Sequence, residues 1–484
     1  MLIRYLSICR LLGMLLMMLS LSQLPPLAVN LLQHEHCASG FIVAFLVMFL
    51  VGVALWWTTR HAKLGLRSRD GFLVVTLLWL VLSLFSAIPF VMLNTVPISW
   101  VDALFESVSG LTTTGASVLQ HLSTFPTSIL YYRMQLHFLG GMGIIVLAVA
   151  VLPMLGIGGL QLYRAEVVGL ADSDKLTPRM THTAKMLWGV YVGIVGLAVL
   201  VYHGLGLSWF EAIDLSFTTV STGGFSLYDN SFAHYHSVAL EYAAIVFMLL
   251  GGTNFALHFR FIRQRRWSVY ARNDEWRFYL GSFVVATVAV GGVLLLHGIH
   301  LHGHAFLDAL FTVVSVGTTT GLTVADFSLW PTFVPFFLMF LALLGGCRGS
   351  TAGGLKMIRC LIARAQMKRE IHRLMHPHAV LPVQIKNVVI SEEVLHGVWG
   401  FAAAFFGMFV VLFLALLACH LDPLTAFSAL AGCFSNMGAG LGQVAHGFTQ
   451  LSAMEKSILI FAMLAGRLEI FTIIIVFMPS YWRQ

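Results

Sequence analysis

The stretch DALFESVSGLTTTG at residues 102–115 decides the fold, because the chain repeats its pattern four times. Three further stretches align with it without gaps: EAIDLSFTTVSTGG at 211–224, DALFTVVSVGTTTG at 308–321 and TAFSALAGCFSNMG at 425–438. In each, a residue of the N-capping type is followed by Ala, and Gly stands thirteen positions after the first residue. Internal repeats dictate architecture, so the sequence predicts four similar units arranged as a ring around one axis.

Each unit is expected to combine a short helix with an extended segment that contains glycine. A helix of about ten residues is ~15 Å long, so it enters a membrane without crossing it. The expected caps satisfy amide groups at the helix start, and the carbonyl end favours a cation inside the membrane. These caps are Asp102, Glu211, Asp308 and Thr425.

The residues that follow each helix are the candidate cation-binding residues. Irregular backbone at membrane depth is tolerated only where it lines a cavity, and rings of backbone carbonyls replace the water shell of an ion in selectivity filters. The predicted filter residues are Thr112, Thr113, Thr114 and Gly115; Ser221, Thr222, Gly223 and Gly224; Thr318, Thr319, Thr320 and Gly321; and Ser435, Asn436, Met437 and Gly438.

Composition places the chain in a membrane. It has 484 residues, of which 58% are hydrophobic and 10% charged, and its mean hydropathy of +0.86 excludes an ordinary soluble protein. Lys and Arg are absent from 95–127, 204–237, 298–333 and 420–452, each of which contains one repeat. By the positive-inside rule, the basic clusters are cytoplasmic and all four repeats open outward. In the alternative interpretation, the basic clusters contact anionic lipid or a partner protein. The clusters are Arg60, Lys63, Arg67 and Arg69; Lys175, Arg179 and Lys185; Arg260, Arg263, Arg265 and Arg266; and Arg364, Lys368, Arg369 and Arg373.

The predicted fold class is an all-α polytopic membrane protein with ten transmembrane helices. Two helices precede the repeats: the first ends near Val29 and the second covers 40–57. A cleaved signal peptide is the alternative for the first helix, but no small-residue cleavage site follows it. Paired outer helices are expected at 72–94 and 128–156, 187–203 and 239–262, 276–297 and 333–360, and 394–418 and 453–478. The predicted units are 1–70 for the two leading helices and basic loop, then repeats at 71–160, 161–265, 266–375 and 376–484.

GGCRGSTAGG at 345–354 interrupts the second outer helix of the third repeat. Five glycines in ten residues do not hold a regular helix. A kinked helix packed through small residues is the structural alternative. We expect instead an irregular gating segment in the cavity under the filter, because disrupted backbone in a membrane requires such a niche. Its candidate gating residues are Gly345, Gly346, Arg348, Gly349, Ser350, Thr351, Gly353 and Gly354.

Arg467 and Glu469 lie deep in the last apolar run, in AGRLEIF. Charged residues at that depth are costly and mark functional sites by default. Two residues apart on a helix, they point in different directions, so we expect Arg467 to face the cavity as a further gating residue. A salt bridge between Arg467 and a residue of another helix is the alternative.

Other motifs are weaker. The tract HGIHLHGH, with His297, His300, His302 and His304, resembles a metal-binding sequence, but histidines are tolerated without a role in an outer connection. The six cysteines form no CxxC pair and indicate neither a disulfide framework nor a zinc site. No Walker loop or GxGxxG after a strand is present, so we expect no nucleotide site and no cofactor in this chain.

These motifs together resemble the Trk-type potassium uptake proteins of bacteria, within the Trk/Ktr/HKT superfamily. The resemblance rests on the TTTG segments, the glycine-rich break, the Arg467 helix, LYRAE at 162–166 and HFLGGMGIIVLAVAVLP at 137–153, and it runs essentially end to end. It implies four helix–pore-loop–helix units around one potassium pathway in the bacterial inner membrane, with potassium as substrate. The family's filter glycines correspond here to Gly115, Gly224, Gly321 and Gly438.

The resemblance also implies partners. It implies a homodimer in the lipid bilayer and a cytoplasmic TrkA-like regulatory subunit that binds a nucleotide, ATP or NAD, and docks on the basic inner loops; no nucleic-acid partner is expected. The chain departs from the family at Arg348 and Ala352, where a small residue and Gly are usual, and in the fourth filter segment, SNMG, which lacks the threonines of TTTG.

We therefore expect a transport protein and no enzyme: potassium-selective uptake through a channel-like pore gated by the cytoplasmic subunit. The alternative is an ion-coupled potassium symporter driven by protons or sodium, in which half-helices bind substrate at the midplane and the repeats rock. Four repeats of one orientation favour the pore.

Overall fold

Apolar helices make up most of the chain, and only one short pair of strands accompanies them among the described residues. The computed structural model describes residues 2–61, 70–93, 96–146, 180–298, 305–379, 381–385 and 388–483. Outside these ranges lie LYRAE at 162–166, part of 137–153, Lys63, Arg67, Arg69, Lys175, Arg179, His300, His302 and His304.

The described elements follow one another along the chain. In order they are α1 (Leu2–Ser20), η1 (Leu21–Gln23), α2 (Leu24–Leu32), α3 (Ala38–Thr59), α4 (Asp70–Ser86), α5 (Ile88–Val91), α6 (Trp100–Leu111), η2 (Leu122–Thr124), α7 (Thr127–Val146), α9 (Met180–Gly204), α10 (Trp209–Val220), η5 (Ser231–Tyr235), α11 (Val238–Gly251), α12 (Phe255–Gln264), α13 (Ser268–Ala271), α14 (Asp274–Leu296), α15 (Ala305–Gly317), η7 (Phe327–Leu329), α16 (Phe333–Leu344), α17 (Met357–Met375), β1 (Gln384–Ile385), β2 (Val388–Val389), α18 (Glu392–Ala418), α19 (Pro423–Phe434), η8 (Gly442–Val444), α20 (Ala453–Arg467), α21 (Glu469–Phe477) and α22 (Pro479–Trp482).

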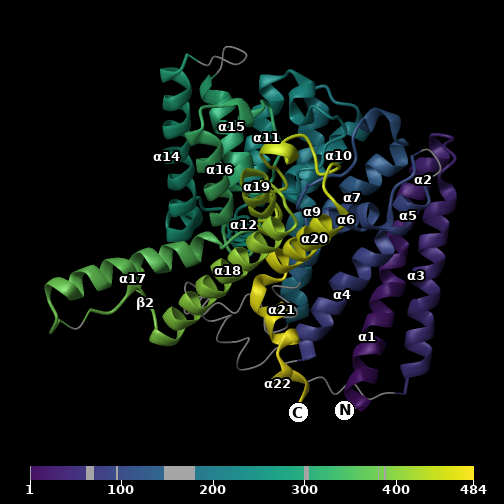
Figure 1. Cartoon of the computed structure of the whole chain (residues 1–484), viewed down its shortest axis with the longest axis horizontal. Coiled ribbons are helices and arrows are strands. Elements are labelled where there is room, and N and C mark those ends of the chain that lie inside the picture. The colour runs from purple at the N-terminus through teal and green to yellow at the C-terminus, as the bar shows by residue number, and fades with distance from the viewer. Residues whose placement is uncertain are drawn as a thin grey trace.

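The chain crosses the membrane several times, which confirms the predicted all-α polytopic fold class. Among the described residues, six helices are long and apolar enough to span a bilayer, or eight if each of two bent pairs is one span. Helix α7 and the interrupted α16 occupy the two remaining positions predicted for outer helices. Both ends of the chain lie at the same end of the molecule, and α17 projects away from the bundle (Figure 1).

Two outer helices predicted as continuous spans are broken, which corrects the expectation for 239–262 and 453–478. Helices α11 and α12 meet at 99° and α20 and α21 at 115°. At the first break, the side chain of Asn254 accepts from the amide of Ala256 and starts a new helix. At the second, Glu469 has a left-handed φ of 52°, which ends the preceding helix.

Each predicted pore helix is a helix of 12 or 13 residues, namely α6, α10, α15 and α19. The predicted caps are wrong in all four. Three of the helices have their cap three residues earlier, and Asp308 is the fourth residue of α15. Ser99, Ser208 and Asp422 accept from the amides of Asp102, Glu211 and Thr425. In α6 and α10 the residue three positions after the cap is acidic and complements the helix dipole, and in α10 it also completes a capping box. Asp308 lies in the first turn of α15.

The four pore helices lie in the middle of the molecule, between α14 on the left and α3 on the right (Figure 1). Most side chains of α6, α10, α15 and α19 are buried. By contrast, Val285 of α14 is 69% exposed and Val411 of α18 is 64% exposed. Apolar side chains on the outside suit lipid contact, whereas the polar backbone after each short helix requires an enclosed position.

Candidate functional site

The four predicted filter segments meet in a closed ring. An ideal Cβ on each final glycine falls 2.0–2.3 Å from a carbonyl oxygen of the next segment. Gly115 faces the carbonyl oxygen of Gly223 in the second segment. Each of the other filter glycines likewise faces a carbonyl oxygen of the next segment, and the fourth faces the first, which closes the ring. The remaining pairs are Gly224 with Thr320, Gly321 with Met437, and Gly438 with Thr114.

Glycine is required at these four positions for two separate reasons. Their φ angles are 81°, 89°, 81° and 81° for Gly115, Gly224, Gly321 and Gly438, in the region that favours glycine. The close approach of the neighbouring carbonyl also leaves no room for a side chain. A larger residue would therefore strain its own backbone and displace a carbonyl of the adjoining segment.

One backbone pattern recurs in all four segments. The residue before each glycine donates its amide to the carbonyl five residues earlier, at 2.7–2.9 Å, as at a helix C-terminus that closes with a left-handed residue. The left-handed residues are Thr113, Thr222, Thr319 and Asn436, with φ of 52–57°. Asn tolerates this region, but a β-branched Thr is an outlier there. Such strain is concentrated at functional sites.

Side chains of the segments bond to the pore helices, to α20 and to one another. Thr112, Thr318 and Ser435 donate their hydroxyls to carbonyls one helical turn earlier, at 2.6–2.7 Å. Asn436 donates to Thr114 Oγ1 and to the Met463 carbonyl. The amide of Asn436 therefore ties the fourth segment to the first and to α20. SNMG keeps the backbone pattern although it lacks threonine.

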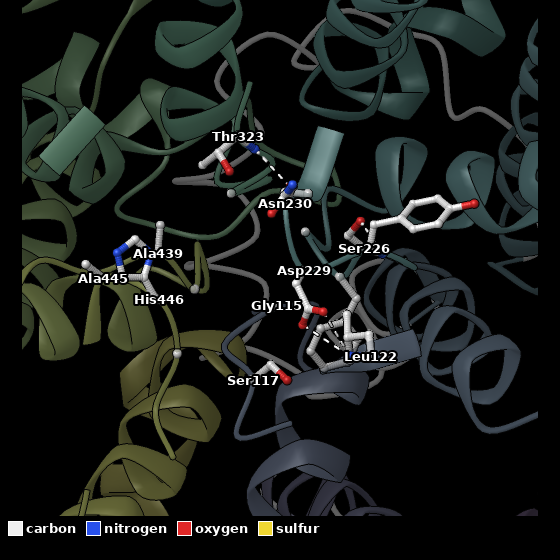
Figure 2. Close-up of a pocket in the computed structure, with 18 of the residues that line it drawn as sticks. Gly115, Ser117, Leu122, Ser226, Asp229, Asn230, Thr323, Ala439, Ala445 and His446 are labelled. Atoms are coloured by element: carbon white, nitrogen blue, oxygen red, sulfur yellow. Dashed lines mark hydrogen bonds between the residues drawn. The ribbon is translucent and has the colours of Figure 1, made fainter. Parts of the chain in front are cut away.

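A cavity of about 710 Å³ opens on one side of the ring. Figure 2 shows residues from all four repeats around it: Gly115 and Asp229 lie near each other, while Thr323 and Ala439 lie on other sides of the cavity. Asp229 accepts from the amide of Leu122, which links the loops after the first two filter segments. Asp326 lies 3.7 Å from His446 Nε2. Carboxylates at this mouth attract cations.

The other side of the ring is covered by the glycine-rich break. Residues 345–356 are not helical, as expected of an irregular segment rather than a kinked helix. Gly353 donates its amide to Thr319 Oγ1 at 2.8 Å, and a Cβ at Gly353 would lie 2.0 Å from the Ser435 carbonyl. Thr351 donates to the carbonyls of Val220 and Gly251. The break thus contacts the ends of the second, third and fourth filter helices.

Other break residues fix the segment to its surroundings. Cys347 donates its amide to the Gly252 carbonyl at 2.8 Å, and Ser350 donates its hydroxyl to Cys347. Arg348 is half-buried and donates its amide to Glu275 of α14 at 2.6 Å. The remaining predicted gating glycines, Gly345, Gly346, Gly349 and Gly354, lie in the same loop.

Arg467 completes this cover. Its guanidinium is 2% exposed and donates to the carbonyl of Thr351 at 2.7 Å and to that of Gly140 at 3.2 Å. Gly140 belongs to α7 and approaches the end of α6. Arg467 therefore connects the break to the first repeat, and within the described residues no carboxylate pairs with it. Glu469 pairs instead with Arg359, at 2.8 Å, in agreement with the expectation that Arg467 and Glu469 diverge.

Comparison with known proteins gives the same relationship along the whole chain. The family model for TrkH, described as a cation transport protein, matches residues 38–285 and 279–484. The Trk system potassium uptake protein TrkH of Halomonas elongata is 42% identical, and the alignment covers 99% of each chain. The TrkG protein of the same system in Escherichia coli is 39% identical over 98% of this chain and 97% of its own. The crystal structure of the potassium transporter TrkH from Vibrio parahaemolyticus superimposes with a TM-score of 0.92 at 40% identity, covering 99% of this chain and 100% of the other.

The chain belongs to the TrkH family. This confirms the resemblance drawn from the sequence, and the relatives are named as transport proteins and not as enzymes. As expected for the TrkH family, the described part is a multi-pass membrane protein.

Sequence reasoning missed three buried residues that adjoin the ring of this TrkH-family chain: Glu106, Arg133 and His137. A signal was available, since Glu106 is a carboxylate in the middle of a repeat and Arg133 interrupts an apolar run. Charged residues at such positions require a partner. The sequence does not show which partner each one finds.

Proposed function

We propose that this chain takes up potassium across the bacterial inner membrane through a channel-like pore. In this proposal, residues 112–115, 221–224, 318–321 and 435–438 are the selectivity filter. The observation that carries it is the closed ring in which each glycine meets a carbonyl of the next segment. Backbone carbonyls held at close quarters can replace the hydration shell of a potassium ion. The names of the relatives support potassium as the substrate.

The break at 345–354 and Arg467 are proposed as the gate. The break occupies the space directly beneath three of the four filter helices, and Arg467 bonds it to α7. A buried positive charge on the ion path repels potassium. Withdrawal of Arg467 with the break would remove both the obstruction and the charge.

A cytoplasmic nucleotide-binding subunit is the proposed partner that moves this gate. Helix α17 begins three residues after the break and carries Arg364, Lys368, Arg369 and Arg373 away from the bundle (Figure 1). A partner bound to α17 would therefore pull on the break through a continuous helix. By the positive-inside rule these basic residues face the cytoplasm and the acidic mouth faces outward. The proposal includes a homodimer and the repeat boundaries 71–160, 161–265, 266–375 and 376–484.

Flux measurements on the purified chain in liposomes test this function. Potassium and sodium uptake would be followed with and without a membrane potential, and with and without a proton gradient. A channel-like pore gives potassium flux that follows the potential alone. Uptake that requires a proton or sodium gradient would establish the symporter instead.

Replacing Gly115 with Ser tests the filter directly. We expect the potassium-to-sodium uptake ratio to fall at least about tenfold, because the added Cβ meets the Gly223 carbonyl and a loss of about 1.4 kcal/mol of discrimination is tenfold. The matching changes at 224, 321 and 438 are expected to act in the same direction. Gly193→Ser on α9 is the control, since no atom lies within 4 Å of a Cβ there. An unchanged ratio in all four filter variants would show that the ring is not the filter.

A further inference from the structure

One face of α7 is directed at the seam between the first and second filter segments. Arg133 and His137 are four residues apart on this helix and so project from the same side. Arg133 is 1% exposed and His137 is fully buried. Both contact residues immediately before or after a filter glycine, although neither belongs to a filter segment.

Arg133 is held by a carboxylate from the first pore helix. Its Nε donates to Glu106 Oε1 at 2.7 Å, and its Nη2 donates to Ser117 Oγ at 3.0 Å. Ser117 in turn donates to Glu106, which also accepts from the amide of Val118 at 3.1 Å. The ion pair therefore fixes the chain two and three residues after Gly115.

The same arginine reaches the second filter segment. Its Nη1 donates to the carbonyl of Ser226 at 3.3 Å, and its guanidinium lies 4.1 Å from the centre of the Phe225 ring. These two residues directly follow Gly224. A planar guanidinium with several donors is suited to such a bridge, since it can satisfy a carboxylate, a hydroxyl and a carbonyl at once.

His137 makes a second bridge across the same seam. Its Nε2 accepts from the amide of Phe225 at 3.1 Å, so its Nδ1 carries the proton and donates to the Gly110 carbonyl at 2.8 Å. The ring also stacks on Phe225 with centroids 4.3 Å apart. The neutral imidazole thus joins the last turn of α6 to the residue after Gly224.

The position of His137 explains why the second filter segment reads STGG instead of TTTG. A Cβ at Gly223 would lie 2.3 Å from the imidazole ring. The residue at this position is Thr114, Thr320 or Met437 in the other segments. The second segment therefore has glycine at position 223 because His137 of α7 occupies the space that a side chain would need.

The other segments have neutral residues at the position of Glu106, and the third and fourth are supported by hydroxyls from other positions of their pore helices. The residues that align with Glu106 are Leu215, Thr312 and Ala429. The third segment is held by Ser315, which donates to the Leu322 carbonyl at 2.7 Å, and the fourth by Ser428, which accepts from the Leu441 amide at 2.9 Å. Within the described residues, only the first seam has a buried ion pair as its support.

We propose that Glu106, Arg133 and His137 are positioning residues that set the cation selectivity of the pore by fixing the spacing of its first and second filter segments. This inference rests on the proposed filter. An ion pair with several satisfied hydrogen bonds is rigid and specific in position. Loss of one charge leaves the other buried without a partner, which displaces the seam rather than merely loosening it.

The test compares uptake ratios per inserted molecule for Glu106→Gln and for a matched control. Glu106→Gln is expected to lower the potassium-to-sodium ratio about tenfold, because one buried partner of Arg133 loses its charge. The control is Asp102→Asn, one turn earlier on α6, which breaks the ion pair with Lys456 that measures 2.6 Å. That pair contacts neither filter segment, so the ratio is expected to stay at the wild-type value.

A milder variant and a double variant keep the inference testable if Glu106→Gln does not insert. Ser117→Ala removes only the hydroxyl between Glu106 and Arg133 and is expected to lower the ratio about threefold. Glu106→Gln combined with Arg133→Gln is expected to lower it less than the two single changes added together, because neither charge is then left alone.

The outcomes separate this inference from the proposed filter. If Ser117→Ala and every inserted Glu106 variant keep the wild-type ratio while Gly115→Ser lowers it, the positioning role is wrong and the filter stands. If Gly115→Ser also keeps the ratio, the filter assignment fails first. A fall in membrane abundance without a change in ratio shows a purely structural ion pair and overturns the proposal.

Discussion

The two sides of the filter ring differ in space and in charge. On one side, a cavity of about 710 Å³ is bordered by Asp229 and Asp326, and the arginine at its wall, Arg133, is neutralised by Glu106. On the other, the cavity beside Arg467 measures only about 20 Å³, room for about one water molecule. Lys356 and Glu469 line that small space as well; the ammonium of Lys356 donates to the Ala352 carbonyl, and Glu469 pairs with Arg359.

We infer that the direction of the proposed pathway comes from the flanks and not from the ring. The four filter segments share one backbone pattern and have no acidic or basic side chain. In the proposed pathway, a cation meets carboxylates in an open space on the first side, whereas on the second side the break fills the space and the buried Arg467 bonds to it. Electrostatic attraction raises the local cation concentration, whereas a charge in a dry site repels over short distances. The proposed mouth is therefore open and lined by carboxylates, whereas the proposed gate is closed and contains a buried arginine.

Shortening the break is expected to open the closed side of the ring, and of all the changes it is expected to have the largest effect on potassium uptake. Removal of residues 349–352 eliminates the bonds from Thr351 to Val220 and Gly251. We expect potassium uptake without a partner subunit to rise about a hundredfold, a change of about 2.7 kcal/mol in the barrier, with the potassium-to-sodium ratio preserved. Thr351→Val is the milder companion. A deletion that inserts normally and leaves uptake unchanged would show that the break only packs the helices.

Replacing Arg467 removes the charge and keeps the break. A unit charge at ~4 Å costs a potassium ion roughly 1–4 kcal/mol, depending on the local dielectric. We expect Arg467→Ala to raise basal uptake about tenfold and to reduce its dependence on the partner.

Arg467→Lys distinguishes the charge from the bridge. If only the field matters, a compact ammonium retains most of the barrier. Because Arg467 bonds both Thr351 and Gly140, we expect Lys, which cannot span both carbonyls as the guanidinium does, to give an intermediate uptake. Membrane abundance is measured in parallel. Normal insertion of Arg467→Ala with wild-type uptake would contradict the barrier, and its disappearance from the membrane would indicate a structural role.

The smallest effect is expected at the mouth. Asp229→Asn removes one charge from the wide cavity but keeps an oxygen that can accept from the amide of Leu122. We expect potassium uptake at low ionic strength and subsaturating potassium to fall about twofold and the difference to vanish in high salt, because exposed charges are screened. Asp326→Asn is a parallel test. A loss that persists in high salt would indicate a structural role for the carboxylate.

Much of the fold followed from the sequence because hydropathy and charge patterns act locally. The apolar runs and the absence of Lys and Arg around each repeat indicated the spans and the four short helices, and the glycine spacing indicated where each helix ends. The breaks at Asn254 and Glu469 were not predicted. Both interrupt runs that remain apolar overall, and a hydropathy pattern registers composition but not a change of direction. Three cap assignments missed by three residues because each true cap is followed three positions later by another polar residue: Ser99 by Asp102, Ser208 by Glu211 and Asp422 by Thr425.

The sequence by itself determined that there are four glycine-ended segments, one glycine-rich interruption and one deep arginine. Tertiary structure decided how they meet: that Gly115 faces Gly223, that Arg467 bonds Thr351 and Gly140, and that Arg133 pairs with Glu106. The physical reason is the range of the interactions. Helix ends and left-handed turns are set by neighbours a few residues away, whereas Arg467 finds its carbonyl partners 116 and 327 residues earlier in the chain. Only packing of the helices brings such groups within hydrogen-bond distance, and burial then obliges them to pair.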